Sequence, residues 1–190
     1  MSGFDGLMHY LTEASIIDKY NNFKRKNMWM TNLEIDFFLK HLEANQRVLE
    51  WGCGSSTIDI SKKVKEVHSI EHNKYWHDNI KLKISNPNMT LYLCEPDEEY
   101  VEGGHCGTFQ QFRTYIKKPL ELGIFDLIFI DGRARIECSK ICKNISHEST
   151  IIFIHDYRGR YFSENYKEIE NYLTFITEVE NLGLFKIKNQ

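Results

Sequence analysis

From residue 47 onwards, short apolar runs alternate with amphipathic segments, and this alternation restricts the chain to one fold class. Five runs have the length and composition of strands, and they are Arg47–Trp51, Glu66–Glu71, Met89–Cys94, Phe125–Asp131 and Thr150–His155. The helices predicted between them are Thr57–Val64, Tyr75–Ile84 and Ala134–Ile145. Alternating strands and helices form βαβ units, whose right-handed crossovers place helices on both faces of a parallel sheet. We therefore predict an α/β three-layer sandwich.

The C-terminal segment departs from this alternation. After a predicted helix around Asn165–Tyr172, two strand-like runs follow one another directly, Leu173–Val179 and Leu184–Lys188. The short link Glu180–Gly183 between them favours an antiparallel hairpin. The sheet is therefore expected to have seven strands, mostly parallel, with the last strand reversed in a C-terminal hairpin.

The N-terminal segment Met1–Ala44 is predicted to be helical. Thr31 or Asn32 can cap a helix within it. Apolar residues recur at helical spacing after this cap, at Leu33, Phe37, Phe38 and Leu42. A chain of 190 residues suits one domain.

The composition excludes several classes of protein. Hydrophobic residues make up 42% of the chain, which is enough for a core, and the net charge of −3 gives no basic field, so a nucleic-acid partner is disfavoured. The five cysteines fit no disulfide framework, and Cys138 with Cys142 lacks the further ligands of a zinc site. No apolar signal sequence opens the chain and no apolar run could span a membrane, so we expect a soluble, cytoplasmic protein without a membrane partner.

The first predicted strand leads through two glycines into a helix, in the order Glu50-Trp51-Gly52-Cys53-Gly54-Ser55-Ser56-Thr57. Gly52 and Gly54 allow a sharp turn and a close approach of the backbone to a ligand. The start of the helix offers free N–H groups and the positive end of its dipole, and the hydroxyl side chains add donors. Glu50 stands at the strand end, where it could accept a ligand ammonium group. The segment predicts a loop that holds a small polar ligand.

An acidic residue, Glu71, ends the second predicted strand. A carboxylate at this position can accept both hydroxyls of a ribose, as the acidic residue of dinucleotide-binding folds does. A dinucleotide loop would carry a third glycine, and Thr57 stands at that position. A nucleotide-like ligand other than a dinucleotide is therefore favoured.

The pattern E-x-G-x-G before a helix, with an acid at the end of the next strand, resembles the class I (Rossmann-like) methyltransferases, which use S-adenosyl-L-methionine. The resemblance covers residues 47–190 and implies a Rossmann-like fold, a methyltransferase activity and this cofactor. The loop residues that would hold its methionine part are Glu50, Gly52, Cys53, Gly54, Ser55, Ser56 and Thr57. Glu71 would hold the ribose and His72 would flank the adenosine. Residues 1–45 would form helices over the cofactor cleft, and residues 46–190 the core.

Polar residues follow the fourth and fifth predicted strands, at the sheet edge where ligands of such folds bind. Asp131, His155 and Asp156 are the predicted catalytic residues, because a hydroxyl acceptor needs a base or a metal to release its proton. An imidazole such as that of His155 titrates near neutral pH, which suits a base. Asp131 and Asp156 could instead hold a divalent cation, magnesium or manganese.

The sequences D-G-R-A-R after the fourth strand and I-H-D-Y at the fifth resemble sugar-directed O-methyltransferases of polysaccharide and viral glycan type. The aspartates are also similar to those of metal-dependent macrolide-sugar enzymes, although a His-Asp pair stands where the catechol-type metal site has Asp-Asn. The resemblance implies a sugar or glycan hydroxyl as the acceptor. The arginines that could clamp it, or form ion pairs at the rim instead, are Arg133, Arg135, Arg158 and Arg160. The glycine-rich stretch Glu98–Phe109 is expected to be a substrate or lid loop.

Other acceptors and a non-catalytic role stay open. Methylation of a nucleic-acid amino group is disfavoured, because none of the three prolines lies in an Asp/Asn/Ser-Pro-Pro-aromatic tetrad. A small-molecule acceptor fits the same residues, as does a cofactor-binding protein without activity. The sequence does not indicate an oligomeric state.

Overall fold

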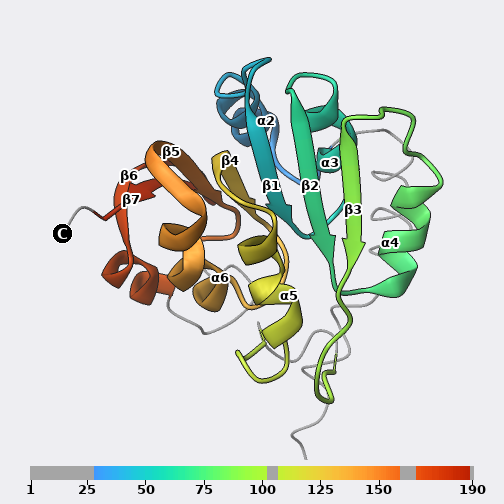
Figure 1. Ribbon diagram of the computed structural model, residues 1–190. Coiled ribbons are helices and arrows are strands. Elements are labelled where there is room, and N and C mark those ends of the chain that lie inside the picture. Colours follow the sequence, from blue (N-terminus) through green and yellow to red (C-terminus); the bar gives the residue numbers. More distant parts are fainter. Residues whose placement is uncertain (1–27, 102–106, 159–165, 189–190) are drawn as a thin grey trace, which may run out of the picture.

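The computed structural model describes residues 28–101, 107–158 and 166–188, and within them the chain forms one twisted sheet of seven strands (Figure 1). The strands are β1 (Arg47–Trp51), β2 (Glu66–Glu71), β3 (Met89–Leu93), β4 (Phe125–Ile130), β5 (Ser146–Ile154), β6 (Leu173–Val179) and β7 (Leu182–Ile187). Their order across the sheet is β3-β2-β1-β4-β5-β7-β6. β7 runs antiparallel to both of its neighbours, and the other pairs are parallel. The predicted mostly parallel sheet with a reversed last strand is therefore confirmed.

Helices cover both faces of the sheet. The α-helices are α2 (Asn32–Leu39), α3 (Ser55–Ser61), α4 (Lys74–Lys81), α5 (Arg113–Lys117) and α6 (Arg135–Ile141). Short 3-10 helices are η2 (Lys118–Glu121), η3 (Cys142–Ile145) and η4 (Tyr166–Asn171). None of the helices in the described part of the chain is long and apolar enough to cross a membrane.

Alternate residues of the central strands divide the core into two clusters. Ile128 and Ile130 of β4 pack with residues of α5, α6 and η4, whereas Leu127 and Phe129 pack with residues of α2 and α3. Because successive side chains of a strand point to opposite faces, the two clusters lie on opposite sides of the sheet. The protein is thus the expected three-layer sandwich.

Helix α2 begins at a capping box. The Thr31 hydroxyl accepts a hydrogen bond from the Glu34 amide at 3.3 Å, and the Glu34 carboxylate accepts one from the Thr31 amide at 2.8 Å. Of the two predicted caps, Thr31 and Asn32, the structure has Thr31 at the N-cap position. Of the apolar residues at helical spacing, Phe37 and Phe38 are buried, but Leu33 is 61% exposed and the adjacent Glu34 is buried instead. The remainder of the predicted N-terminal helical segment, residues 1–27, lies outside the described residues.

Four elements differ from their predicted form. The helix α5 and the 3-10 helix η2 were not predicted, although the buried residues Tyr115 and Ile116 follow Phe112 at helical spacing. Strand β5 begins earlier than predicted, since Ser146 pairs with Phe125 beyond an irregularity in the register. The hairpin turn is two residues rather than four, because Leu182 is fully buried and pairs with Val179.

The packing of α2 predicts a large effect of Phe38→Ala. The Phe38 ring is fully buried, with its centroid 4.7 Å from that of Phe129 and 5.1 Å from that of Phe153. Its removal should lower the free energy of unfolding by about 3–5 kcal/mol, measured by urea denaturation. Leu33→Ala on the same helix is the control and should change it by less than about 0.5 kcal/mol. Equal effects of the two variants would show that α2 does not pack on the sheet as described.

Candidate active site

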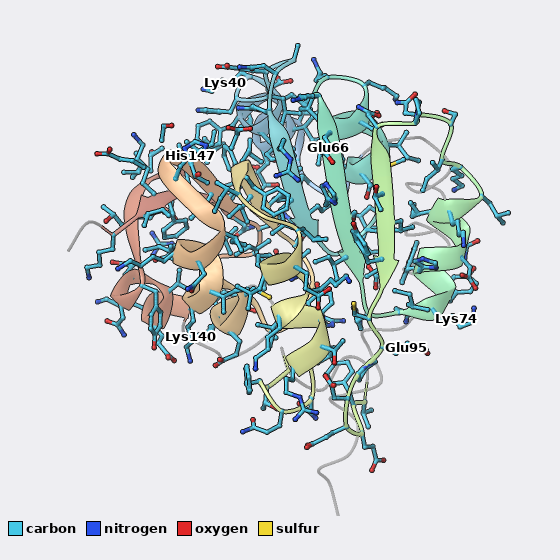
Figure 2. All side chains as sticks on the ribbon, in the orientation of Figure 1. Lys40, Glu66, Lys74, Glu95, Lys140 and His147 are labelled. Atoms are coloured by element: carbon cyan, nitrogen blue, oxygen red, sulfur yellow. The ribbon has the colours of Figure 1, made fainter. Side chains whose placement is uncertain are left out.

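The carboxyl ends of β1, β2, β4 and β5 meet at one edge of the sheet, because these strands are parallel. In Figure 2, Glu66 marks the amino end of β2, while Lys74 and Glu95 mark the opposite edge, where the chain leaves β2 and β3. The predicted cofactor and catalytic residues lie in the last two residues of a strand or after it, at this second edge. Ligands of open α/β sheets bind at such an edge, where the strand order reverses. Here β1 lies at that reversal, between β2 and β4.

The glycine loop after β1 touches the loop after β4. Gly52 has a φ of +95°, and a Cβ built on it would lie 2.8 Å from both Cα and N of Gly132. Its amide donates to the Ile70 carbonyl at 2.8 Å, so the turn is fixed to β2 as well. Only glycine fits this conformation and this contact. Gly54 is extended and has space around it, so its backbone does not require glycine.

Glu50 is fully buried beneath the glycine loop. Its carboxyl group accepts hydrogen bonds from the hydroxyls of Ser56, Thr57 and Ser69, at 2.5, 2.5 and 2.7 Å. Burial raises the pKa of Glu50 to about 7, although the three hydroxyls oppose the shift. Glu50 therefore fastens the loop to α3 and β2 from inside. Its contact with a ligand ammonium group stays a prediction.

Glu71 joins the glycine loop to the start of α4. One carboxylate oxygen accepts from the Cys53 amide at 2.8 Å, and the other accepts from the amides of His72 and Asn73 at 3.0 and 2.7 Å. The loop residue Ser55 is partly exposed. Burial, together with the neighbouring acid Glu71, raises the pKa of the Cys53 thiol far above neutral, so this sulfur is no thiolate nucleophile.

Aromatic rings surround His72. Its ring centroid lies 5.5 Å from that of Phe112, 5.9 Å from that of Tyr115 and 6.3 Å from that of Tyr100. Tyr100 belongs to the predicted substrate loop Glu98–Phe109, of which residues 102–106 lie outside the described residues. The end of β2 therefore combines a carboxylate with flat apolar surfaces.

The catalytic residues predicted after β4 and β5 come together around His155. Its Nδ1 lies 2.8 Å from Asp131 Oδ1, and its Nε2 lies 3.7 Å from Glu34 Oε2. Burial alone would lower the pKa of His155, but the charges of Asp131 and Glu34 outweigh it and raise the pKa to about 10. The imidazole is therefore protonated at neutral pH. This charge state argues against His155 as a base and leaves Asp131, whose side chain is 23% exposed, as the candidate.

Glu34 is the residue of this cluster that the sequence analysis missed. It is 1% exposed, and besides His155 it meets the amides of Thr31 and Asn181, each at 2.8 Å. Burial opposes ionisation, yet the ion pair with His155 and the hydrogen bonds from the two amides lower the pKa of Glu34 to about 2. The available signal was the T-x-x-E capping box, which accounts for only one of these contacts.

Arg135 occupies the space between the two predicted metal ligands. Its guanidinium lies 3.5 Å from Asp131 Oδ1 and 3.6 Å from Asp156 Oδ2, and it donates to backbone carbonyls around them. A cation already lies between these carboxylates, so the residues present do not fit a divalent ion. Within residues 28–101, 107–158 and 166–188, no group of three or more His, Cys, Asp or Glu side chains could hold a metal.

The other arginines predicted to bind the substrate differ in their burial and in their contacts. Arg133 is partly buried, with its guanidinium 6.0 Å from the centre of the Tyr100 ring. Arg158 is exposed and pairs with Glu178 at 2.5 Å. Arg160 lies outside the described residues. Arg135 is buried and Arg158 is paired with Glu178, so the three of these arginines in the described part of the chain do not form one exposed anion clamp, and their contact with substrate stays a prediction.

Comparison with known proteins finds similarity at the level of fold. No family model matches the chain, and no curated protein matches it either. Among solved structures, a methyltransferase-like protein from Silicibacter pomeroyi is 21% identical with a TM-score of 0.64, over 86% of this chain and 89% of that one. A TehB-like SAM-dependent methyltransferase from Corynebacterium glutamicum is 13% identical with a TM-score of 0.59, over 92% and 97%.

A third similar structure contains ligands. A 16S rRNA methyltransferase from T. thermophilus, in complex with AdoMet and guanosine, is 11% identical with a TM-score of 0.54, over 84% of this chain and 44% of that one. The chain therefore has the Rossmann-like fold found in SAM-dependent methyltransferases, with the strand order and the reversed strand described above.

The environment of Glu34 predicts a pH dependence of stability. Because its pKa is about 2 in the folded protein and 4.5 ordinarily, Glu34 stabilises the fold above pH 4.5, and this contribution is lost as pH falls from 4.5 towards 2. Glu34→Gln should therefore lower the free energy of unfolding at neutral pH by on the order of 3 kcal/mol and less at pH 3, measured by urea denaturation.

Glu180→Gln is the matched control for this variant. Glu180 accepts a hydrogen bond from the Thr31 hydroxyl at the same junction between α2 and the hairpin, but the bond is exposed. Glu180→Gln should change the free energy of unfolding by less than about 1 kcal/mol at every pH. A difference between wild type and Glu34→Gln that stays constant from neutral pH to pH 3 would contradict the proposed ionisation of Glu34.

Proposed function

We propose that this protein is a methyltransferase that binds S-adenosyl-L-methionine at the carboxyl ends of β1 and β2. The observation that carries the proposal is the Gly52 turn beside Glu71, at the strand reversal of a sheet with the fold of SAM-dependent methyltransferases. A Cβ at Gly52 would fill the space that this turn needs against Gly132. The donor and acceptor groups at this edge suit a ligand with an amino-acid tail, a ribose and a flat base.

The residues present fit this cofactor in three parts. The loop from Gly52 to Thr57 would hold the methionine part through its backbone. Glu71 would accept the ribose hydroxyls, and His72 with the partly exposed ring of Tyr100 beside it would contact the adenine. When bound, the cofactor supplies a methyl group on a positively charged sulfur, together with the leaving group.

We further propose that the acceptor is a hydroxyl of a sugar or glycan. The support is the resemblance of the segments after β4 and β5 to sugar-directed O-methyltransferases, and the partly exposed carboxylate of Asp131 next to the glycine loop. Asp131 would accept a hydrogen bond from the hydroxyl, orient its oxygen and take its proton. The protonated His155 fixes the orientation of Asp131 through the contact at 2.8 Å. A small-molecule acceptor, nucleic acid and a non-catalytic role are the alternatives that the experiments below separate.

Cofactor binding can be measured by isothermal titration calorimetry with S-adenosylhomocysteine. Glu71→Ala should weaken binding by at least about tenfold, because it removes the acceptor proposed for the ribose. Glu66→Gln is the control, since Glu66 begins the same strand at the opposite edge, where it pairs with Arg47 at 2.7 Å. Absence of heat for the wild-type protein, or equal affinities of both variants, would contradict the proposed site.

Turnover can be measured as S-adenosylhomocysteine release with panels of oligosaccharides, catechols and RNA. Sugars should support release, and Asp131→Asn should reduce the rate by about a hundredfold or more while cofactor affinity stays within about threefold. Asp126→Asn is the control, because Asp126 also pairs with a histidine of β5, His147, at the far end of β4. Release with RNA or catechols alone would identify another acceptor class, and cofactor binding without any release would favour the non-catalytic role.

A further inference from the structure

Arg135 has more contacts at the carboxyl edge than a surface arginine of a helix would make. It is 8% exposed, although it is the first residue of α6. Its Nε donates to the Gly132 carbonyl at 2.9 Å, Nη2 to the Asp131 carbonyl at 3.3 Å, and Nη1 to the His155 carbonyl. The guanidinium therefore connects the loop after β4 to the end of β5.

The carboxylates of Asp131 and Asp156 flank this guanidinium at 3.5 and 3.6 Å. These distances are too long for hydrogen bonds and correspond to ion pairs. The N–H groups of Arg135 thus point at carbonyls, while its charge acts on both carboxylates. A planar, permanently charged group with several fixed donors can do both at once.

The backbone around Arg135 supports the same interpretation. Ala134 and Asp156 have φ values of 50° and 51°, in the left-handed region that residues other than glycine seldom adopt. Such conformations persist where the surrounding contacts determine them. Here the Gly132 carbonyl, which accepts from Arg135, lies two residues before Ala134, and the His155 carbonyl, which also accepts from it, lies directly before Asp156.

We propose that Arg135 is a positioning residue that serves as a built-in cation between Asp131 and Asp156, in the place that a divalent ion would otherwise take. The protein then orients Asp131 without a metal. The charge arrangement at the ends of β4 and β5 can be tested without knowledge of the cofactor or the acceptor.

The test is a titration of the full chain with manganese, followed by electron paramagnetic resonance. Wild type and Asp131→Asn should bind Mn²⁺ equally weakly, because neither has a vacant pair of carboxylates. Arg135→Met removes the charge and keeps most of the side-chain volume, and it should bind Mn²⁺ at least about tenfold more tightly than wild type. Arg135→Lys, which keeps the charge, should bind Mn²⁺ as weakly as wild type. The double variant Arg135→Met/Asp131→Asn should lose the increase in Mn²⁺ affinity that Arg135→Met shows.

Arg47→Met is the matched control. Arg47 also pairs with a carboxylate, Glu66, and donates to the carbonyls of Leu122 and Ile124, but it does so at the opposite edge of the sheet. It should gain no Mn²⁺ affinity. Binding of Mn²⁺ by wild type that Asp131→Asn abolishes would overturn the proposal, and so would an Arg135→Met affinity equal to that of wild type. If circular dichroism finds Arg135→Met unfolded, the Mn²⁺ affinities of wild type and Asp131→Asn still test the proposal, because a loss of affinity in Asp131→Asn would overturn it.

Discussion

Burial of charge at the carboxyl edge of the sheet is the constraint around which this structure is arranged. Glu34, Glu50 and Glu71 are all buried there, and an isolated buried carboxylate costs several kcal/mol. A different set of polar partners stabilises each of the three carboxyl groups. Glu50 has three hydroxyls, Glu71 has three backbone amides, and Glu34 has two amides and an imidazolium. Because these partners come from separate elements, satisfying the acids also fixes the relative positions of α2, the glycine loop and the hairpin.

The sequence predicted the features that depend on neighbouring residues. The predicted bounds of β1 and β2 agree with the structure, because the residues of a buried strand themselves form a short apolar run that is visible in the sequence. The turn at Gly52 was predictable for the same reason, because strand, glycine and helix follow one another directly. Glu71 was found at the edge of the sheet because parallel strands end on the same side. These predictions required no knowledge of distant contacts.

The features that were missed depend on residues far apart in the chain. The partners of Glu34 include Asn181 and His155, and no local pattern connects a capping box to a hairpin turn. For the same reason, His155 was expected to be a base with an ordinary pKa, whereas two acids hold it protonated. Arg135 was left as either a substrate clamp or an ion-paired residue of the rim, because the sequence alone does not say whether an arginine at a helix start points outwards or back over the strand ends.

The two-residue turn between β6 and β7 is short, yet it is not an independent surface loop. The Asn181 amide donates to Glu34 and its carbonyl accepts from Tyr157, while Glu180 has a φ of 52°. Hairpin tips are usual places to attach a tag, insert a domain or open a circularly permuted chain. In this protein an insertion there would separate Glu34 from one of its donors and disturb His155. Protein engineers who need a permissive position should therefore choose another loop.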